Sequence, residues 1–229
     1  MADFGTIRDL KQGLIRKPLA GAILIAPYDI ELPTAYFTGE GSELVDLKAS
    51  GFVSIGHVSK ENAPTFTPET ETSEVEAWGL LESARMDMIS RKTTIQWTGL
   101  ETHKLNLEMW HNTDLANVRY DASTGETAFA DPVEPSITYR RALFLSVDGA
   151  AANRIFMIRE APKFSVTEVG AQSMNQDQAI EYQITGRAFV DDAKQYALRT
   201  VFGGPGWKSI VQQAGFEPAA APQARSRAA

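Results

Sequence analysis

The sequence contains no cysteine among its 229 residues. This absence excludes a disulfide framework, a thiolate nucleophile and a thiolate metal site, so packing or association has to stabilise the folded state. No apolar run approaches the roughly eighteen residues of a membrane span. The first ten residues also lack the long apolar stretch of a secretory signal, because Arg8 and Asp9 interrupt it. We therefore expect a soluble protein, synthesised and assembled in the cytoplasm, that does not associate with a membrane.

The chain also has fewer basic than acidic residues. The chain has 22 Lys and Arg residues against 29 Asp and Glu residues, which gives a net charge of −7. The basic residues are scattered, whereas nucleic-acid affinity is built from clustered Lys and Arg that displace counterions from phosphates. This balance argues against a protein that holds nucleic acid. It is compatible with a protein that lets DNA pass without sticking, and equally with an ordinary acidic cytoplasmic protein.

Catalytic signatures are also scarce. The three histidines are His57, His103 and His111, and although Glu108 lies near the last two, the spacing fits no His-Glu-x-x-His pattern. The sequence has no Gly-x-Ser-x-Gly elbow and no phosphate-binding Gly-x-x-x-x-Gly-Lys motif. The run Gly203-Gly-Pro-Gly206 reads as a turn, because its proline removes an N–H that an anion site would use. We predict no catalytic, cofactor-binding or metal site, and a protein that is not an enzyme.

Several segments carry strand signals, in which apolar and polar residues alternate with a period of two or form short apolar runs. Between two of them, Asp148-Gly149 indicates a hairpin turn. A further strand is expected to begin at Phe164, after Pro162. The expected strands cover residues 93–98, 143–147, 155–158 and 180–187. They predict a mainly β fold in which an antiparallel sheet closes or folds on itself, as a sandwich or barrel.

One helix is expected after residue 98. The pattern Thr98-Gly-Leu-Glu101 matches a capping box, in which Thr98 would be the N-cap. On a helical wheel Leu105 and Met109 lie together, nearly opposite a second apolar stripe. One stripe can pack against the sheet of its own subunit. The second indicates either deep burial or a neighbouring subunit, and the sequence leaves both open.

The remaining segments are less regular. We expect one domain over residues 1–216, with an extended irregular loop at 27–50 that either has a function or covers one end of its own barrel. One or two short helices are expected between residues 191 and 216. Residues 217–229 lack large apolar side chains after Phe216, which predicts a flexible tail.

An acidic series, Glu69, Glu71, Glu74 and Glu76, precedes Trp78. Alternation would place Glu74, Glu76 and Trp78 on one face of a strand, where paired carboxylates could in principle serve acid–base chemistry. A solvated acidic face is the commoner use of such a run, and it is the interpretation that we prefer.

The order of motifs between Gly51 and Met109 carries a resemblance to a known family. Glycines bracket the segment Gly51-Phe-Val-Ser-Ile-Gly56, a Thr- and Glu-rich segment from Phe66 ends in Glu76-Ala-Trp78, and a strand then leads into the expected helix. This order resembles the major tail (tail tube) proteins of long-tailed, siphovirus-type bacteriophages. The resemblance implies a β-sandwich or barrel with a flanking helix, in a structural virion protein assembled in the host cytoplasm.

The resemblance also implies partners. Family members form hexameric rings that stack on a tape measure protein, and DNA passes through the lumen without specific binding; tail terminator and tail tip proteins would bind the ends of the tube. The 27–50 loop would be the arm that reaches a neighbouring subunit or ring. The subunit interface would use Tyr28, Tyr36, Phe37, Leu105 and Met109, and Glu74 and Glu76 would face the lumen or the outer surface. The alternatives are another virion β-domain, such as a decoration or receptor-binding module, and a small metal-dependent hydrolase.

Overall fold

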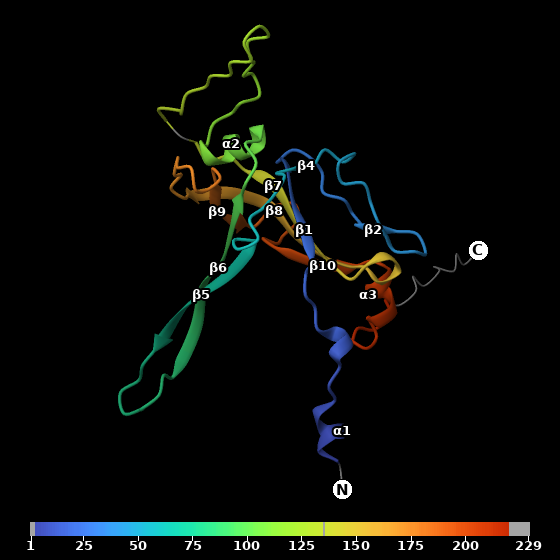
Figure 1. Ribbon diagram of the computed structural model, residues 1–229. Helices are drawn as coiled ribbons and strands as arrows, with labels where there is room; N and C mark the ends of the chain where they lie inside the picture. Colours follow the sequence, from blue (N-terminus) through green and yellow to red (C-terminus); the bar gives the residue numbers. More distant parts are fainter. Residues whose placement is uncertain (1–2, 135, 220–229) are drawn as a thin grey trace, which may run out of the picture.

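The computed structural model describes residues 3–134 and 136–219, and its mainly antiparallel β architecture confirms the expected fold class (Figure 1). An eight-stranded sheet has the order β4-β1-β7-β8-β9-β6-β5, with β10 paired to β8. Its strands are β1 (Ala20–Pro27), β4 (Val53–Ser54), β5 (Thr65–Val75), β6 (Arg85–Gly99), β7 (Arg140–Asp148), β8 (Ile155–Val169), β9 (Tyr182–Phe189) and β10 (Arg199–Gly203). A small sheet joins β2 (Phe37–Thr38) to β3 (Glu43–Leu44), and the helices are α1 (Phe4–Arg8), α2 (Lys104–Trp110) and α3 (Pro205–Ile210), with 3-10 turns η1 (Gln12–Leu14) and η2 (Ala151–Asn153).

The sheet folds back on itself through the segment that follows β4. Ile55 donates its backbone N–H to the carbonyl of Ile23 on β1, at 3.1 Å. A few residues later Val58 bridges Gly99 of β6, and Ser59 donates to the carbonyl of Thr98 at 2.8 Å. This one segment therefore connects the edge of β1 to β6, the strand at the other side of the sheet, and gives the body of the protein a barrel-like enclosure.

The interior of this enclosure is filled by aromatic and branched side chains. The ring of Trp97 contacts the rings of Phe144 and Phe164, each at a centroid distance of 5.5 Å, and Phe66 meets Phe144 edge-on. These tilted and edge-to-face contacts are the arrangements that aromatic pairs prefer. The buried members of the cluster are Ile23, Ile25, Ile55, Ile95, Trp97, Met109, Ala142, Phe144, Ala161, Phe164, Ile184 and Ala188.

Strand β1 is buried on both of its faces. Ile23 and Ile25 point into the barrel, whereas Leu24 and Ala26 point outward into a second cluster beneath the segment that joins β1 to β4. That cluster comprises Leu24, Ala26, Leu32, Tyr36, Leu47, Phe52, Leu143 and Ile158. Two-sided burial explains why β1 and β7 read as continuous apolar runs rather than as alternating strands.

The predicted hairpin at Asp148-Gly149 is confirmed, since β7 and β8 pair on either side of it. Gly149 has φ of 80°, a conformation that suits glycine. The expected separate strand after Pro162 is wrong, because β8 runs through that residue without a break. Pro162 lies where the pairing with β7 shifts register, between Ala161 and Phe164, so its missing N–H is tolerated at an irregularity of the ladder.

The predicted capping box is also wrong. Thr98 is buried in β6, where its N–H donates to the carbonyl of Asn62 and its carbonyl accepts from Ser59. The helix α2 begins at Lys104, with His103 as the N-cap. Glu101 accepts from the N–H of His57 at 2.8 Å instead of reaching back to Thr98. The strand continues past the point where local pattern favoured a helix, because Thr98 and Gly99 pair with Gln183 and Tyr182 of β9.

The other expectations for irregular segments hold in part. Residues 27–50 are mainly irregular and contain only the short strands β2 and β3. One short helix, α3, lies between residues 191 and 216, and it begins at Pro205, a favourable first position for proline. The strand β10, which no sequence pattern indicates, precedes it. The expected flexible tail lies largely outside the described residues.

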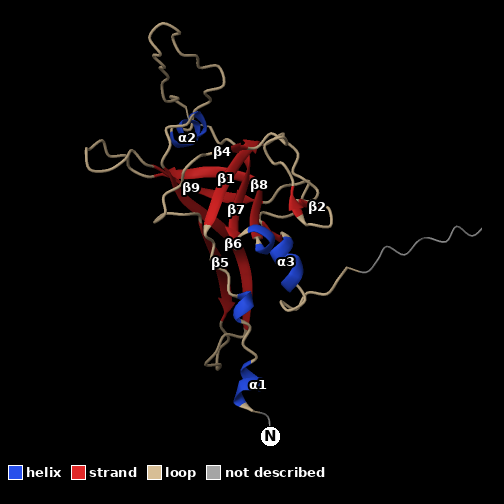
Figure 2. Ribbon diagram, turned by 45° about the vertical axis from the view of Figure 1, so that its right-hand side comes forward, coloured by secondary structure: helices blue, strands red, loops and turns tan. Residues whose placement is uncertain are grey.

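Three segments project from the body (Figures 1 and 2). The far halves of β5 and β6 form a hairpin that extends away from the barrel, and the N-terminal segment leaves the same end of the molecule. A long loop between α2 and β7 projects from the opposite end, beside α2. The molecule therefore has two different ends, which is the geometry needed for head-to-tail contacts between copies.

Candidate assembly surfaces

The outer part of the β5–β6 hairpin exposes an unusual number of large apolar side chains. Trp78 and Leu81 in its turn are completely exposed. We define the hairpin tip as residues 75–89, whose exposed apolar members are Val75, Trp78, Leu80, Leu81, Met86, Met88 and Ile89. Scattered single apolar residues are normal at a protein surface, but several large ones gathered in one projecting hairpin are typical of an interaction site.

The inner part of the same hairpin is polar. Glu69 pairs with Lys92, Thr70 with Arg91 and Glu71 with Ser90 across the two strands, and Ser90 donates a hydrogen bond to Glu71 at 3.1 Å. Residues 67–71 of β5 pair with residues 90–94 of β6, and neither segment contains a large apolar side chain. This part can remain in water, so the hairpin consists of a solvated stalk that carries an apolar tip.

The outer face of the barrel beside this stalk is polar as well. Side chains paired across β5, β6 and β9 share that face, because directly opposed residues of antiparallel strands point to the same side. Threonine and glutamine dominate it. We define the polar wall as Thr65, Thr67, Thr94, Gln96, Gln183, Thr185 and Arg187, all exposed or half-buried. The outer face of β1 and β7, by contrast, is covered by the loop at 27–52.

The acidic residues Glu74 and Glu76 are not arranged as predicted. β5 ends at Val75, so Glu76 and Trp78 lie in the connection to β6 and not on a strand face with Glu74. Along β5, Glu74 alternates with Glu69 and Glu71 and points to the other side of the hairpin. All four carboxylates are exposed. The structure therefore does not place Glu74, Glu76 and Trp78 together on one strand face.

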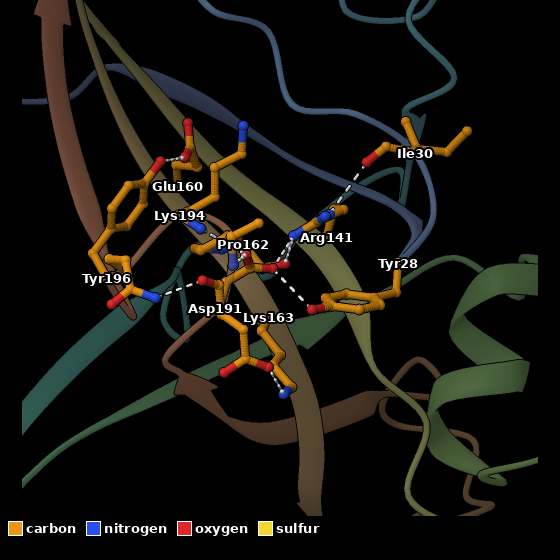
Figure 3. A network of polar contacts seen from close by, with 12 residues as sticks. Tyr28, Ile30, Arg141, Glu160, Pro162, Lys163, Asp191, Lys194 and Tyr196 are labelled. Carbon is orange, nitrogen blue, oxygen red and sulfur yellow. Dashed lines mark hydrogen bonds and ion pairs between the residues drawn. The ribbon is translucent and has the colours of Figure 1, made fainter.

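A buried polar network holds the 27–50 loop against its own subunit (Figure 3). The carboxylate of Glu160 on β8 is completely buried. It accepts hydrogen bonds from the hydroxyls of Tyr36 and Tyr196, the former at 2.5 Å, and pairs with the guanidinium of Arg199 at 2.7 Å. Burial and the hydrogen bond to Glu160 raise the pKa of Tyr36 well above its ordinary value, and those causes raise the pKa of Tyr196 to about 12. Both tyrosines therefore remain donors at any physiological pH.

A second buried carboxylate, Asp191, closes the same region (Figure 3). It accepts from Arg141 at 2.5 Å and from the hydroxyl of Tyr28 at 2.9 Å, while its other oxygen accepts from the backbone N–H groups of Ala193 and Lys194. Burial alone would raise the pKa of Asp191, but the hydrogen bonds from Arg141, Lys194 and Tyr28 outweigh it and lower the pKa to about 2. We call the Glu160 and Asp191 groups together the latch.

The latch determines where the predicted interface residues of the loop lie. Tyr36 is buried and bonded within its own subunit, so in this conformation it is not available as an exposed anchor. Phe37 is half-buried and packs on Phe156. Its ring lies so close to Gly203 that a Cβ atom at position 203 would clash with it. Tyr28 is half-buried beneath the guanidinium of Arg141, 4.3 Å from its ring centroid. The segment thus covers its own sheet, one of the two alternatives that the sequence left open.

The remaining predicted interface residues belong to α2. Met109 is completely buried in the barrel core, and Leu105 packs against that core while half-buried. The helix is anchored by Asn106, whose side-chain amide donates to the carbonyls of Ile55 and Glu101, both at 2.9 Å. Burial within the chain therefore accounts for Met109.

Beside α2 lies an open pocket of about 580 Å³. The ends of β1 and β4, the start of β7 and one side of α2 form its walls. Its apolar lining includes Ile25, Ala26, Pro27, Val53, Leu105 and the ring of Tyr139, and its charged residues are Lys104, Glu108, Asp114 and Arg140. We call this cavity the α2 pocket. No local sequence pattern indicates this pocket, because residues distant in the chain form it.

The histidines have local structural contacts. The side chain of His57 pairs with Glu101, which also accepts the backbone N–H of His57, and that hydrogen bonding lowers the pKa of Glu101. His111 pairs with Asp131 at 2.7 Å. Among residues 3–134 and 136–219 there is no group of side chains suited to holding a metal ion. Within that same part of the chain, no helix is long and apolar enough to cross a membrane.

The N-terminal segment is a further candidate surface that was not predicted from the sequence. Residues 3–19 carry exposed apolar side chains at Phe4, Ile7, Leu10, Ile15 and Leu19. The spacing of three between the first members was the available signal. Arg16 ties the end of this segment to Asp148 at 3.0 Å, and the part before it projects from the body (Figure 1).

Comparison with known families gives one finding. A family model described as "Phage tail tube protein" matches residues 10–200, which include every strand of the large sheet up to the start of β10. No curated protein matches the chain.

Proposed function

Because this chain belongs to the phage tail tube protein family, we propose that its copies assemble into stacked rings that form the tube of a phage tail. The family is a structural one, and its members are components of the virion tail. By the resemblance stated above, the rings are hexamers and DNA leaves the phage head through their lumen.

The observation that carries this proposal is the hairpin tip. Burying an apolar side chain of the size of Leu or Met is worth about 1.5–3 kcal/mol relative to leaving it in water. The tip exposes several such groups together at the end of an ordered strand pair. A protein that functions as a monomer gains nothing from this arrangement, whereas a protein that polymerises gains one such contact for every copy added.

The polar wall is the surface that we assign to the lumen. It lies beside the stalk of the hairpin, and its side chains are exposed or half-buried. Its threonines and glutamines offer neither the clustered cations that would bind the phosphate backbone nor a large apolar surface. The opposite wall of the barrel is covered by the loop that the latch fixes, so it faces away from the passing DNA.

The partners follow from this role. The tube would enclose the tape measure protein before DNA release, and tail terminator and tail tip proteins would bind its two ends. The two ends of the subunit differ (Figure 2), which suits a filament whose two ends bind different proteins.

Electron microscopy and light scattering test the assembly. The purified protein, examined over a wide concentration range beside tails isolated from virions, should form rings or tubes of the width seen in those tails. The double variant Trp78→Ser, Leu81→Ser should remain folded and fail to form them. A strictly monomeric wild-type protein that is also absent from virions would refute the proposal, and a discrete oligomer at every concentration would favour a decoration or receptor-binding module.

A charge change on the polar wall tests the lumen assignment. Gln96→Lys with Thr185→Lys places two cations on that wall, where they would attract the passing phosphates. The tubes should form normally, while the rate of DNA ejection from assembled phage should fall. Gln178→Lys, a change in the exposed loop before β9, provides the matched control. Equal ejection rates for the two variants would place the lumen on another face.

A further inference from the structure

The hairpin tip and the α2 pocket lie at opposite ends of the molecule. Figures 1 and 2 show the hairpin extending from one end of the barrel and α2 at the other, in both orientations. One surface is an apolar projection and the other is a partly apolar cavity. When copies are placed head to tail, the projection of one copy points toward the cavity of the next.

The tip has the composition of an interface anchor. Trp78, Leu80 and Leu81 fall within four consecutive residues and are all exposed. Tryptophan is enriched among the residues that dominate binding energy at interfaces. The connection that carries these side chains has no basic residue, and its acids are Glu76 and Glu82.

The α2 pocket has an apolar lining that such a group could contact. Val53, which lies on the edge strand β4 and lines the pocket, is itself a large apolar residue that is about half exposed. Lys104 at the rim lies 3.9 Å from Glu108, which is a loose pairing. Asp114 and Arg140 carry opposite charges, so the lining of the cavity has no net charge from this pair. An apolar group can therefore enter without burying an excess of charge of one sign.

We propose that the hairpin tip of one copy docks in the α2 pocket of the next copy. The inference rests on the proposed function and adds the contact by which subunits are joined. The contact is heterologous, since two different surfaces meet, and repetition of a heterologous contact produces a ring or an open filament instead of a closed dimer.

The N-terminal segment is the competing occupant of the pocket. Its apolar residues Phe4, Ile7, Leu10 and Ile15 are spread over twelve positions, an arrangement that suits a long groove. The three large side chains of the tip are concentrated at one point. A single open pocket of about 580 Å³ accommodates such a compact group better.

The absence of native cysteine permits a direct test. In the double variant Leu81→Cys, Val53→Cys, one thiol lies on the tip and the other on the pocket wall. A disulfide requires Cα atoms within about 7 Å of each other, so it forms only where the two surfaces meet. Mild oxidation of assembled protein should give a ladder of covalent dimers, trimers and higher oligomers. Each single-cysteine variant should give no species beyond a dimer.

Two further pairs serve as controls. Leu81→Cys with Met174→Cys places the second thiol on an exposed residue outside the pocket and should give no ladder. Leu10→Cys with Val53→Cys tests the N-terminal segment. A ladder from this pair in place of the first would overturn the assignment of the tip as occupant.

A second measurement does not depend on thiol chemistry. Val53→Glu should raise the concentration needed for assembly by roughly tenfold or more, because it places an uncompensated charge in the contact. Val190→Glu, at a comparably exposed residue outside the pocket, should have no such effect. If wild-type tubes form while the Leu81–Val53 pair gives no ladder, the docking is wrong and the proposed function stands. If neither tubes nor ladder forms, both are wrong.

Discussion

The two halves of β6 have opposite environments although they belong to one continuous strand. From Ile95 to Gly99 the strand pairs with β9 on one side, and on the other side it contacts first β5 and then the segment 58–62. This half contributes Trp97 to the centre of the barrel. From Arg85 to Ile89 it is paired to β5 alone, and its side chains are exposed. The inner half is stabilised by contacts within the subunit, whereas the outer half has apolar side chains and no partner within the described chain.

This difference separates stability from assembly. A substitution in the inner half removes contacts that the isolated subunit already makes, so it should lower the free energy of unfolding. A substitution in the outer half removes contacts that only the assembly makes. The same residue type, changed in each half, should therefore give different measurable effects.

The two tryptophans of the hairpin provide the largest contrast. Trp97 is fully buried and Trp78 is fully exposed. Trp97→Ala should lower the free energy of unfolding by about 3–5 kcal/mol, as for other buried aromatic truncations, and Trp78→Ala by less than about 0.5 kcal/mol. Only Trp78→Ala should yield a stable subunit that fails to assemble. Urea unfolding and electron microscopy measure the two effects, and a comparable loss of stability from both changes would contradict the comparison.

The latch is expected to give the next largest effect. Tyr36→Phe removes a hydrogen bond to the buried carboxylate of Glu160, and should destabilise the subunit by about 1.5–3 kcal/mol, the range for a hydrogen bond to a charged group. Tyr120→Phe, at an exposed tyrosine, is the control and should be neutral. Thermal unfolding of both variants measures this. If Tyr36→Phe instead forms a normally stable subunit that cannot assemble, the 27–50 loop is an intersubunit arm after all.

Acid should weaken the latch through Asp191. Its pKa falls from the ordinary 3.8 to about 2 on folding, so its charged form stabilises the folded state above pH 4, and that contribution disappears as the pH falls toward 2. The loss amounts to about 2 kcal/mol. The wild type should lose this much more stability than Asp191→Asn between pH 4 and 2, as followed by urea unfolding. If the free energies of unfolding of the two proteins change equally between pH 4 and 2, the contacts of Asp191 do not stabilise its charged form.

The smallest effect is expected in the polar stalk. Glu69→Gln with Glu71→Gln changes two exposed carboxylates that make only surface contacts, where pairs contribute about 0–1 kcal/mol. Stability should change by less than about 0.5 kcal/mol and tubes should still form. Loss of tubes from this variant would extend the intersubunit contact from the tip into the stalk.

Several elements of the fold could be predicted from the sequence because their signals are local. The alternation at 93–98, the apolar runs on either side of Asp148-Gly149 and the alternation near Ile184 all correspond to observed strands. The wrong helix start shows where local signals fail. Thr98-Gly-Leu-Glu101 is a good helix start in isolation, but pairing with β9 extends the strand through it, and contacts across the sheet outweigh a capping preference of about 1 kcal/mol.

The predicted interface residues illustrate the same limit. Tyr36 is a predicted anchor of the 27–50 arm and Met109 belongs to one of the two apolar stripes of the expected helix, yet both side chains are internal. The turn at Trp78 offered a comparable signal, and that residue is completely exposed. Composition identifies which side chains need an apolar environment. It does not distinguish an environment within the same chain from one in a neighbour.

The sequence by itself determined the β class of this protein, its acidic charge, its lack of thiols and its resemblance to tail tube proteins, because these depend on residue identity and on short-range order along the chain. Only the tertiary structure decided that the 27–50 loop is latched to its own sheet by Glu160 and Asp191, and that the apolar tip of the hairpin is left uncovered. Both outcomes depend on which distant segments meet in space. Such meetings are governed by long-range pairing and burial, which no local pattern encodes.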